Sequence, residues 1–205
     1  SVLTQSDSNT KIEATGASSS YVASDVSDIV EAVMPSIVSI TNVSESQYQS
    51  FFGGTQTQQS TSCGSGIIVS QDADNLYIAT NNHVVEGADS LTVAFSDNTT
   101  VSAEIKGTDP STDLAVIRVA LSSIDSDTLN TIKVATLGNS DDLKAGQAAI
   151  AIGNALGYGQ SVTTGVISAL NREVTVSDSN SNTNYTAELI QTSAAINPGN
   201  SGGAL

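Results

Sequence analysis

Residues 91–105 read LTVAFSDNTTVSAEI and contain two runs in which apolar and polar residues alternate. Alternation places every second side chain on the same face of a strand. The apolar face of these two runs would hold Leu91, Val93, Phe95, Val101, Ala103 and Ile105. The polar residues 96–99 between the runs, SDNT, have the composition of a hairpin turn. This stretch therefore predicts a β-hairpin that buries one face.

Other short runs rich in β-branched residues lie on both sides of this hairpin, and polar turns separate them. Together with the hairpin they predict a first set of strands at 37–43, 65–70, 76–80, 91–95, 101–106 and 114–119, and a second set at 133–137, 148–152, 161–170, 173–176 and 185–191. The polar residues 122–131 form the natural joint between the two sets. Because no long helical pattern intervenes, this spacing favours an all-β sandwich or barrel over a parallel sheet.

One short helix is expected before the first strand. Apolar residues recur at i, i+3, i+4 and i+7 from Val26 to Val33, which is the spacing of one helix face. Ser24 or Asp25 could cap this helix, and Pro35 would end it. The pattern predicts a short amphipathic helix near the N-terminal end.

Two polar segments, residues 48–62 and 177–184, are expected to be long loops. The first of them contains Phe51 and Phe52, whose rings could anchor a partner. We favour the alternative that these rings form a local plug over the neighbouring strands.

Composition excludes several classes of function. The chain has 205 residues, enough for one large domain or two small ones, and it carries 6 Lys+Arg against 21 Asp+Glu, a net charge of −15. Such a charge disfavours nucleic acids and anionic membrane surfaces, because binding to them needs basic side chains. One His and one Cys cannot build a zinc finger, an iron–sulfur cluster or an internal disulfide, so we expect no metal and no cofactor.

Location can be inferred only weakly from composition. Charged residues make up 13% of the chain, and Ser, Thr, Asn and Gln carry most of its polarity. No stretch approaches the roughly 20 consecutive apolar residues of a membrane span. We expect an extracytoplasmic protein that is secreted, periplasmic or held at the cell surface by an anchor outside this chain.

Three separated blocks contain the residue types needed for acyl transfer: TNNHVV at 80–85, TDLAV at 112–116 and AAINPGNSGGAL at 194–205. A single histidine is more often structural than catalytic, and a glycine-rich string is often only a turn. Cleavage of a peptide bond by a serine, however, needs a base, a carboxylate that orients the base, and donors for the oxyanion. His83, Asp113 and the glycines around Ser201 supply all of these.

The three blocks resemble the HtrA/Deg-type serine proteases, and their order, His then Asp then Ser, is that of chymotrypsin-like enzymes. The resemblance implies two six-stranded antiparallel β-barrels of the chymotrypsin type with a short N-terminal helix. Residues 1–22 would be a flexible tail, 23–125 the barrel with His83 and Asp113, and 126–205 the barrel with Ser201. The second barrel is expected to be incomplete, because strands that follow the nucleophile in this family have no counterpart before Leu205.

The same resemblance assigns roles to individual residues. Ser201 would be the nucleophile, His83 the general base and then acid, and Asp113 the orienting carboxylate. Gly199 and Ser201 would form the oxyanion hole. Ile196 would line a substrate pocket that accepts small or medium aliphatic side chains.

Three further residues bear on this assignment. Trypsin-like zymogens mature through an ion pair with an Asp before the serine, but Asn200 carries no charge, so switching of loops is the expected alternative. Ser193 stands where the family usually has Asp, and we expect a local change in hydrogen bonding. Cys63 has no basic neighbour and is expected to be a loop residue, not a reactive thiol.

These features predict an HtrA-like serine endopeptidase of protein quality control that acts on misfolded or exposed polypeptides. The alternative is a noncatalytic protease-fold fragment that binds peptide or a partner chain. A third hypothesis, an acidic surface adhesin, leaves the three blocks unexplained. The resemblance also implies a homotrimer formed through Tyr21, Val22 and the following helix, and a C-terminal fragment or PDZ domain outside this chain.

Overall fold

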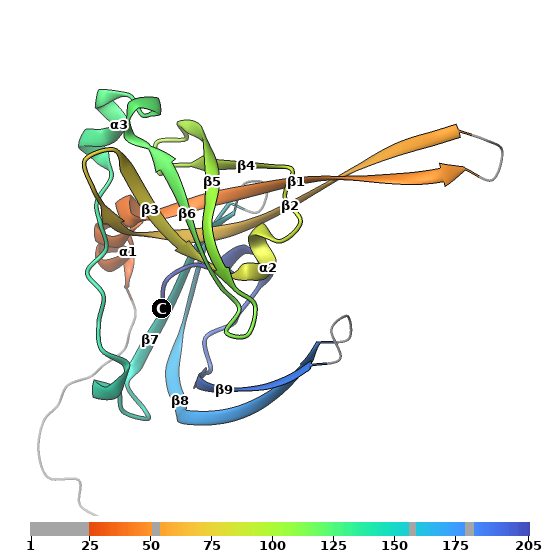
Figure 1. Ribbon diagram of the computed structural model, residues 1–205. Helices are drawn as coiled ribbons and strands as arrows, with labels where there is room; N and C mark the ends of the chain where they lie inside the picture. The colour runs from red at the N-terminus through yellow and green to blue at the C-terminus, as the bar shows by residue number, and fades with distance from the viewer. Residues whose placement is uncertain (1–24, 51–53, 156–158, 179–182) are drawn as a thin grey trace, which may run out of the picture.

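The computed structural model describes residues 25–50, 54–155, 159–178 and 183–205 (Figure 1). Most of these residues lie in nine strands: β1 (Ile37–Ser50), β2 (Gly54–Gln71), β3 (Asn75–Thr80), β4 (Ser90–Ala94), β5 (Thr100–Asp109), β6 (Leu114–Ala120), β7 (Ala148–Ala155), β8 (Gly159–Asp178) and β9 (Thr183–Thr192). The helices in the described part are short: α1 (Ser27–Val33), α2 (Asn82–Val85), α3 (Ser126–Thr131) and the 3₁₀ turns Met34–Ser36, Leu121–Ser123, Ser140–Asp142 and Pro198–Asn200. The expectation of an all-β protein is confirmed.

The first six strands form a closed antiparallel barrel in the order β1-β2-β3-β6-β5-β4. The barrel closes where β4 pairs with β1, from Ser39 opposite Ala94 to Val43 opposite Ser90. Its core is one apolar cluster to which all six strands contribute, with Ile40, Ile78 and Ile117 fully buried. Within the barrel, closure pairs the strands on both sides, which is how barrels avoid exposed backbone groups.

The hairpin predicted at 91–105 is β4 and β5, with Leu91 opposite Ala103. Asn98 adopts the left-handed conformation in its turn (φ 68°), which asparagine tolerates better than most residues. Four of the six expected inward side chains are buried, and Ala103 is partly buried. Ile105 is 44% exposed, next to the register shift between Ile105 and Gly107.

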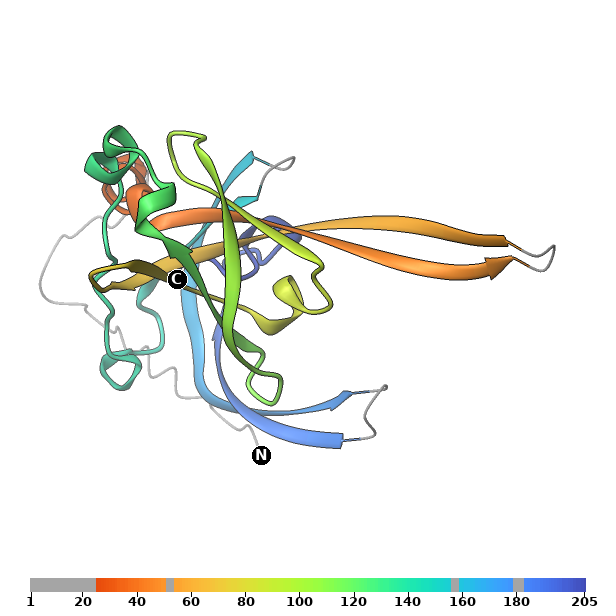
Figure 2. The same cartoon turned by 45° about the horizontal axis from the view of Figure 1, so that its top comes forward.

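The described parts of both predicted long loops are strands. β1 and β2 stay paired as far as Ser50 opposite Gly54 and project from the barrel as a two-stranded arm (Figures 1 and 2). β8 and β9 likewise stay paired as far as Asp178 opposite Thr183. Such ribbons are stabilised by backbone hydrogen bonds and bury little, so their polar sequences show no alternation. Phe51 and Phe52 lie outside the described residues.

In the second half, the strand predicted at 133–137 is absent, and the break predicted between the strands at 161–170 and 173–176 is wrong. Residues 133–137 form an extended connection outside any ladder, although Lys133 N–H bonds to the Pro35 carbonyl (3.0 Å) and Ala135 N–H to the Ile68 carbonyl (2.8 Å). Residues 161–170 and 173–176 belong to one strand, β8, whose pairing with β9 shifts between Ile167 and Arg172.

The joint expected at 122–131 is ordered and docks on the first barrel. The Asp125 side chain caps α3 by accepting a hydrogen bond from Thr128 N–H (2.8 Å). Ile124 is buried in the barrel core, and the buried Thr128 hydroxyl donates to the Asp97 carboxylate in the β4–β5 turn (2.6 Å).

α1 packs where the barrel meets β7. Its cap differs from the expectation: Val26 holds the N-cap position, and the Asp25 carboxylate accepts from Ser27 N–H (3.0 Å). The hydrogen bonds from the Ser27 hydroxyl and N–H lower the pKa of Asp25. Val30 is buried against Ile37 of β1 and Ile152 of β7. Ser24, Tyr21 and Val22, like the whole tail 1–22, lie outside the described residues.

The second half of the described chain forms a three-stranded antiparallel sheet in the order β7-β8-β9. A bridge between Ile152 and Ala204 brings the residues after Ser201 against β7. In its described part this sheet buries few apolar side chains, namely Ala149, Ala151, Ile152 and Ile167. Other apolar side chains are exposed, among them Val166, Val174, Leu189 and Ile190. Within the described segments, no helix has the length and apolar character to cross a membrane.

Candidate active site

His83 and Asp113 are brought together at one end of the first barrel. His83 lies in α2, the single turn that follows β3, and Asp113 ends the turn that leads into β6. The His83 Nδ1 atom lies 2.7 Å from Asp113 Oδ2, and the His83 backbone N–H donates to Asp113 Oδ1 (2.9 Å). Both carboxylate oxygens therefore contact the same residue, which fixes the orientation of the imidazole and favours the tautomer with hydrogen on Nδ1.

Asp113 itself has a strained backbone. Its φ is 53°, in the left-handed region that non-glycine residues rarely adopt. Its carbonyl oxygen accepts two hydrogen bonds, from the Asn81 side-chain amide (2.8 Å) and from Asn82 N–H (3.0 Å). Residues 81–83 thus contact Asp113 through both its carbonyl and its carboxylate. The role of Asn81 was missed by the sequence analysis, although Asn81 stands in the histidine block.

The turn before Asp113 is organised by Asp109. The Asp109 carboxylate accepts from the Ser111 hydroxyl, the Ser111 N–H (3.0 Å) and the Thr112 hydroxyl (3.0 Å). These hydrogen bonds, those from Ser111 first, lower the pKa of Asp109. They hold the turn in the shape that presents Asp113 to His83.

Ser201 follows the 3₁₀ turn Pro198–Asn200. The Asn200 side chain is buried inside this turn, where its oxygen accepts from Asn197 N–H (2.9 Å) and its nitrogen donates to the Ala195 carbonyl (3.1 Å). The neutral side-chain amide of Asn200 therefore holds the residue before Ser201 in place through hydrogen bonds within the same loop.

The turn around Ser201 is wedged between the barrel and β7. Ser65 N–H of β2 donates to the Ser201 carbonyl (2.8 Å). Gly202 has φ 79°, and a Cβ added to it would lie 2.3 Å from the Ser65 carbonyl oxygen. A Cβ on Gly153 of β7 would lie 2.3 Å from the Gly199 carbonyl oxygen. Only glycine allows this close approach of three backbone segments.

The His83 ring and the Ser201 hydroxyl are not bonded to each other. In the part of the chain that the structure describes, no hydrogen bond joins them. The His83 side chain is 55% exposed, so its ring is open to an incoming group. Ile196, five residues before Ser201, is 63% exposed and presents an apolar side chain to solvent.

The other singled-out side chains lie in ordinary surroundings. The Ser193 hydroxyl accepts from Val166 N–H (3.0 Å), a local hydrogen bond to β8. Cys63 is not a loop residue: it is half-buried in β2 opposite Thr41, whose hydroxyl lies 3.9 Å from the sulfur. Among the described residues, no group of three or more His, Cys, Asp or Glu side chains could hold a metal ion.

Comparisons with known proteins identify the family of the chain. A family described as trypsin-like peptidase domain matches residues 64–205. The serine protease Do-like HtrA of Bacillus subtilis (strain 168) is 43% identical over 189 residues, covering 89% of this chain and 40% of that protein. A probable periplasmic serine endoprotease DegP-like of Halomonas elongata is 46% identical over 149 residues, covering 73% of this chain and 28% of that protein.

A solved structure described as HtrA-type protease AlgW with decapeptide is 33% identical, with a TM-score of 0.63, over 88% of this chain and 55% of that chain. The chain thus spans well under two thirds of the length of each of these relatives. The sequence match and the shared fold together establish that the chain belongs to the trypsin-like peptidases and is homologous to the HtrA-type serine proteases among them.

Proposed function

We propose that the protein is an HtrA-like serine endopeptidase that hydrolyses peptide bonds of misfolded or exposed polypeptides. The observation that carries this proposal is the contact of 2.7 Å between His83 Nδ1 and Asp113 Oδ2, made in a barrel whose β2 also binds the backbone of Ser201. Membership in the peptidase family supports the same reaction.

In this mechanism the Ser201 Oγ attacks the carbonyl carbon of the scissile peptide and passes its proton to His83 Nε2. Asp113 holds the Nδ1 hydrogen and stabilises the imidazolium. The N–H groups of Gly199 and Ser201 donate to the oxyanion. His83 then protonates the leaving amine, and water repeats the sequence on the acyl-enzyme to release the acid.

The separation of Ser201 and His83 is compatible with this sequence of steps, because catalytic hydrogen bonds are often absent or long until substrate binds. In this mechanism the Ser201 hydroxyl donates to His83 Nε2 once substrate is bound. Ile196 would meet the side chain before the cleaved bond, and its apolar surface suits a small or medium aliphatic group.

The described residues show no hydrogen bond between the His83 ring and the Ser201 hydroxyl, and this favours a second candidate function. That candidate is a noncatalytic protease-fold fragment that binds peptide without cleaving it. The two candidates differ in the reactivity of one hydroxyl. Labelling with a fluorophosphonate, read by intact mass, is expected to add one adduct to the unsubstituted chain and none to Ser201→Ala. Proteolysis of an unfolded protein substrate should be lost in the same variant. Binding of peptide without labelling or cleavage would support the noncatalytic candidate.

We also propose that the chain acts outside the cytoplasm and assembles as a homotrimer through its N-terminal region. The name of the Halomonas relative includes the word periplasmic. On α1, Ile29 is 50% exposed and could contribute to a contact between subunits. Sedimentation equilibrium is expected to give three times the chain mass, and Ile29→Glu is expected to reduce it. A monomer for the unsubstituted chain would contradict the proposal.

The division into a tail at 1–22, a unit at 23–125 and a unit at 126–205 belongs to the same proposal. Because Ile124 and Thr128 dock on the first barrel, we propose to move the boundary between the two units from residue 125 to the end of α3 at Thr131. Limited proteolysis should therefore cut before residue 25 sooner than between residues 121 and 131.

A further inference from the structure

Ser65 stands at the point where β2 meets the turn around Ser201. Its side chain is fully buried, and it lies between Gly64 and Gly66 in the strand. A buried hydroxyl is costly unless its hydrogen-bonding capacity is used. Ser65 lies outside the three blocks that indicate the chemistry.

Every polar group of Ser65 has a partner. Its N–H donates to the Ser201 carbonyl (2.8 Å), and its carbonyl accepts from the buried Thr80 hydroxyl (2.7 Å). Its hydroxyl donates to the Gly199 carbonyl (2.9 Å) and accepts from Asn154 N–H of β7 (2.7 Å). One side chain thus connects the barrel, β7 and the turn that carries Ser201.

The two carbonyls that Ser65 binds lie on either side of the Ser201 N–H. The Gly199 carbonyl belongs to the peptide unit just before that of the Ser201 N–H, and the Ser201 carbonyl belongs to the peptide unit just after it. A peptide unit is planar, so the direction of the Ser201 N–H is tied to that of the Asn200 carbonyl in the same unit, which accepts from Gly203 N–H (2.9 Å). The bonds from Ser65 hold the units on either side of this one. Close approaches at Gly202 and Gly153 pack the turn against Ser65 and β7.

We propose that the Ser65 hydroxyl is a positioning group for the nucleophile and the oxyanion hole. This inference rests on the proposed peptidase function of the same site. Any residue except proline could supply the backbone N–H and carbonyl bonds at position 65. Only the bonds to Gly199 and Asn154 require a hydroxyl, so they are what a substitution removes.

The test compares Ser65→Ala with Thr128→Val in the full chain. Thr128 also has a buried hydroxyl with two partners, Asp97 and Thr99. It lies on α3, and its hydroxyl makes no hydrogen bond to the turn around Ser201. The measured quantity is the second-order rate constant of fluorophosphonate labelling. Ser65→Ala is expected to lower it by roughly 10- to 100-fold, the effect of a small misplacement of reacting groups. Thr128→Val is expected to label at the unsubstituted rate.

A spectroscopic measurement separates positioning from a loss of folding. With ¹³C carbonyl-labelled glycine and ¹⁵N-labelled asparagine, only the Gly–Asn peptides at 138–139, 153–154 and 199–200 give correlated signals. Ser65→Ala is expected to shift the 199–200 carbonyl signal and the 153–154 amide signal and to leave the 138–139 signal in place. Ser65→Cys, which is slightly larger and donates only weakly, should give an intermediate labelling rate and a partial shift.

The outcomes are distinguishable. An unlabelled unsubstituted chain would overturn the proposed function and this inference with it. A labelled unsubstituted chain and a folded Ser65→Ala variant with the same rate and the same 199–200 signal would overturn the inference alone. If Ser65→Ala does not fold, the inference depends on Ser65→Cys, and an unchanged rate in that variant would overturn it.

Discussion

The first barrel and the β7–β9 sheet support their parts of the site in different ways. The barrel has a continuous apolar core from six strands, and it holds His83 and Asp113 through side-chain bonds made within the barrel. The described part of the sheet buries few apolar side chains, and the turn with Ser201 that packs on it takes part of its support from Ser65 of the barrel. The base and its carboxylate thus depend on one folded unit, whereas the nucleophile depends on the contact between two.

The largest expected effect on activity comes from breaking the pair of His83 and Asp113 in the first barrel. Asp113→Asn keeps the side-chain shape but removes the charge that orients the His83 ring. We expect the fluorophosphonate labelling rate to fall by roughly 10⁴-fold, as in other Ser-His-Asp sites. Circular dichroism should stay that of the folded chain. A loss of less than tenfold would show that the carboxylate does not orient the base.

Core substitutions compare the stability of the two regions directly. Ile78→Ala empties a fully buried site in the barrel and should lower the free energy of unfolding by roughly 2–5 kcal/mol. Leu189→Ala on β9 removes a side chain that is 45% exposed. It should change the free energy of unfolding by about 0.5 kcal/mol or less. Urea denaturation measures both. Equal losses would mean that Leu189 is covered in solution.

Asn81→Ala tests the strained backbone of Asp113. Removing the amide leaves the Asp113 carbonyl with the single bond from Asn82 N–H, and the left-handed conformation loses part of its support. The labelling rate should fall by about fivefold, in line with a net hydrogen bond of about 1 kcal/mol. Asn139→Ala is the matched control, because it also removes a side-chain bond to a turn (Asp141 N–H, 3.2 Å). Equal rates for the two variants would contradict the role of Asn81.

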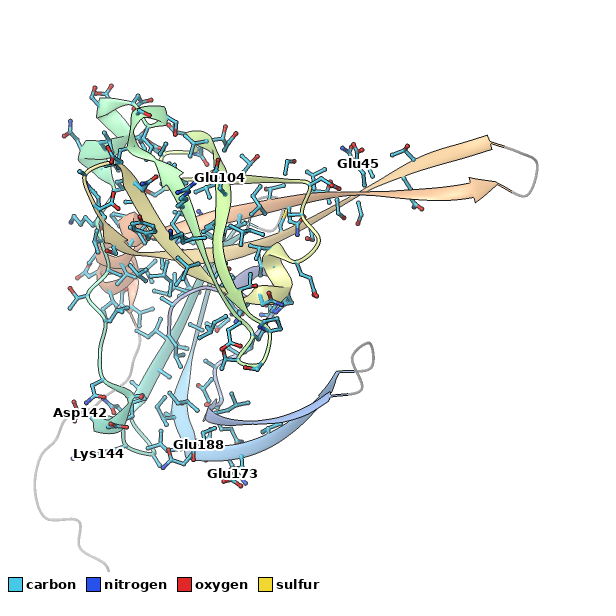
Figure 3. The ribbon with its side chains drawn as sticks, in the orientation of Figure 1. Glu45, Glu104, Asp142, Lys144, Glu173 and Glu188 are labelled. Atoms are coloured by element: carbon cyan, nitrogen blue, oxygen red, sulfur yellow. The ribbon has the colours of Figure 1, made fainter. Side chains whose placement is uncertain are left out.

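The smallest effect concerns the sheet surface. Glu173 and Glu188 lie opposite each other on β8 and β9, and Figure 3 shows both side chains on this ribbon. Like charges at such positions destabilise a strand pair, so Glu188→Gln should raise stability by about 0.5 kcal/mol. Thermal denaturation at low salt measures it, and the gain should shrink as salt is added. A gain that is independent of salt would exclude repulsion as its cause.

Sequence periodicity predicted those parts of the fold that bury side chains. Leu91, Val93 and Phe95 alternate because one face of β4 lines the core, and this pattern placed the hairpin correctly. The arm of β1 and β2 has no such face, so its polar sequence was taken for a loop. Residues 133–137 show the converse error, since an apolar run there forms no ladder.

The candidate site was predicted from local blocks, and its supporting contacts were not. His83, Asp113 and Ser201 stand in short motifs that can be read directly. Ser65 and Gly199 are separated by 134 positions in the chain, and no local pattern reports a contact across such a distance. Asn81 lies beside His83, but its partner is a backbone carbonyl whose unusual φ the sequence does not reveal.

The bonds between Ser65 and the Ser201 turn also have a consequence for the order of folding. Contacts between residues far apart in the chain close large loops, and they form late because the entropy lost in closing such a loop is large. The barrel can complete its hydrogen-bonded ladder with residues 37–120, but the turn cannot reach its final position until β7 and residues 199–202 are in place. A chain emerging from the ribosome would therefore hold a folded base and carboxylate before it has a reactive hydroxyl. In refolding experiments, fluorophosphonate labelling should recover after the secondary structure of the barrel. During synthesis, the same order would keep the growing chain from cleaving itself.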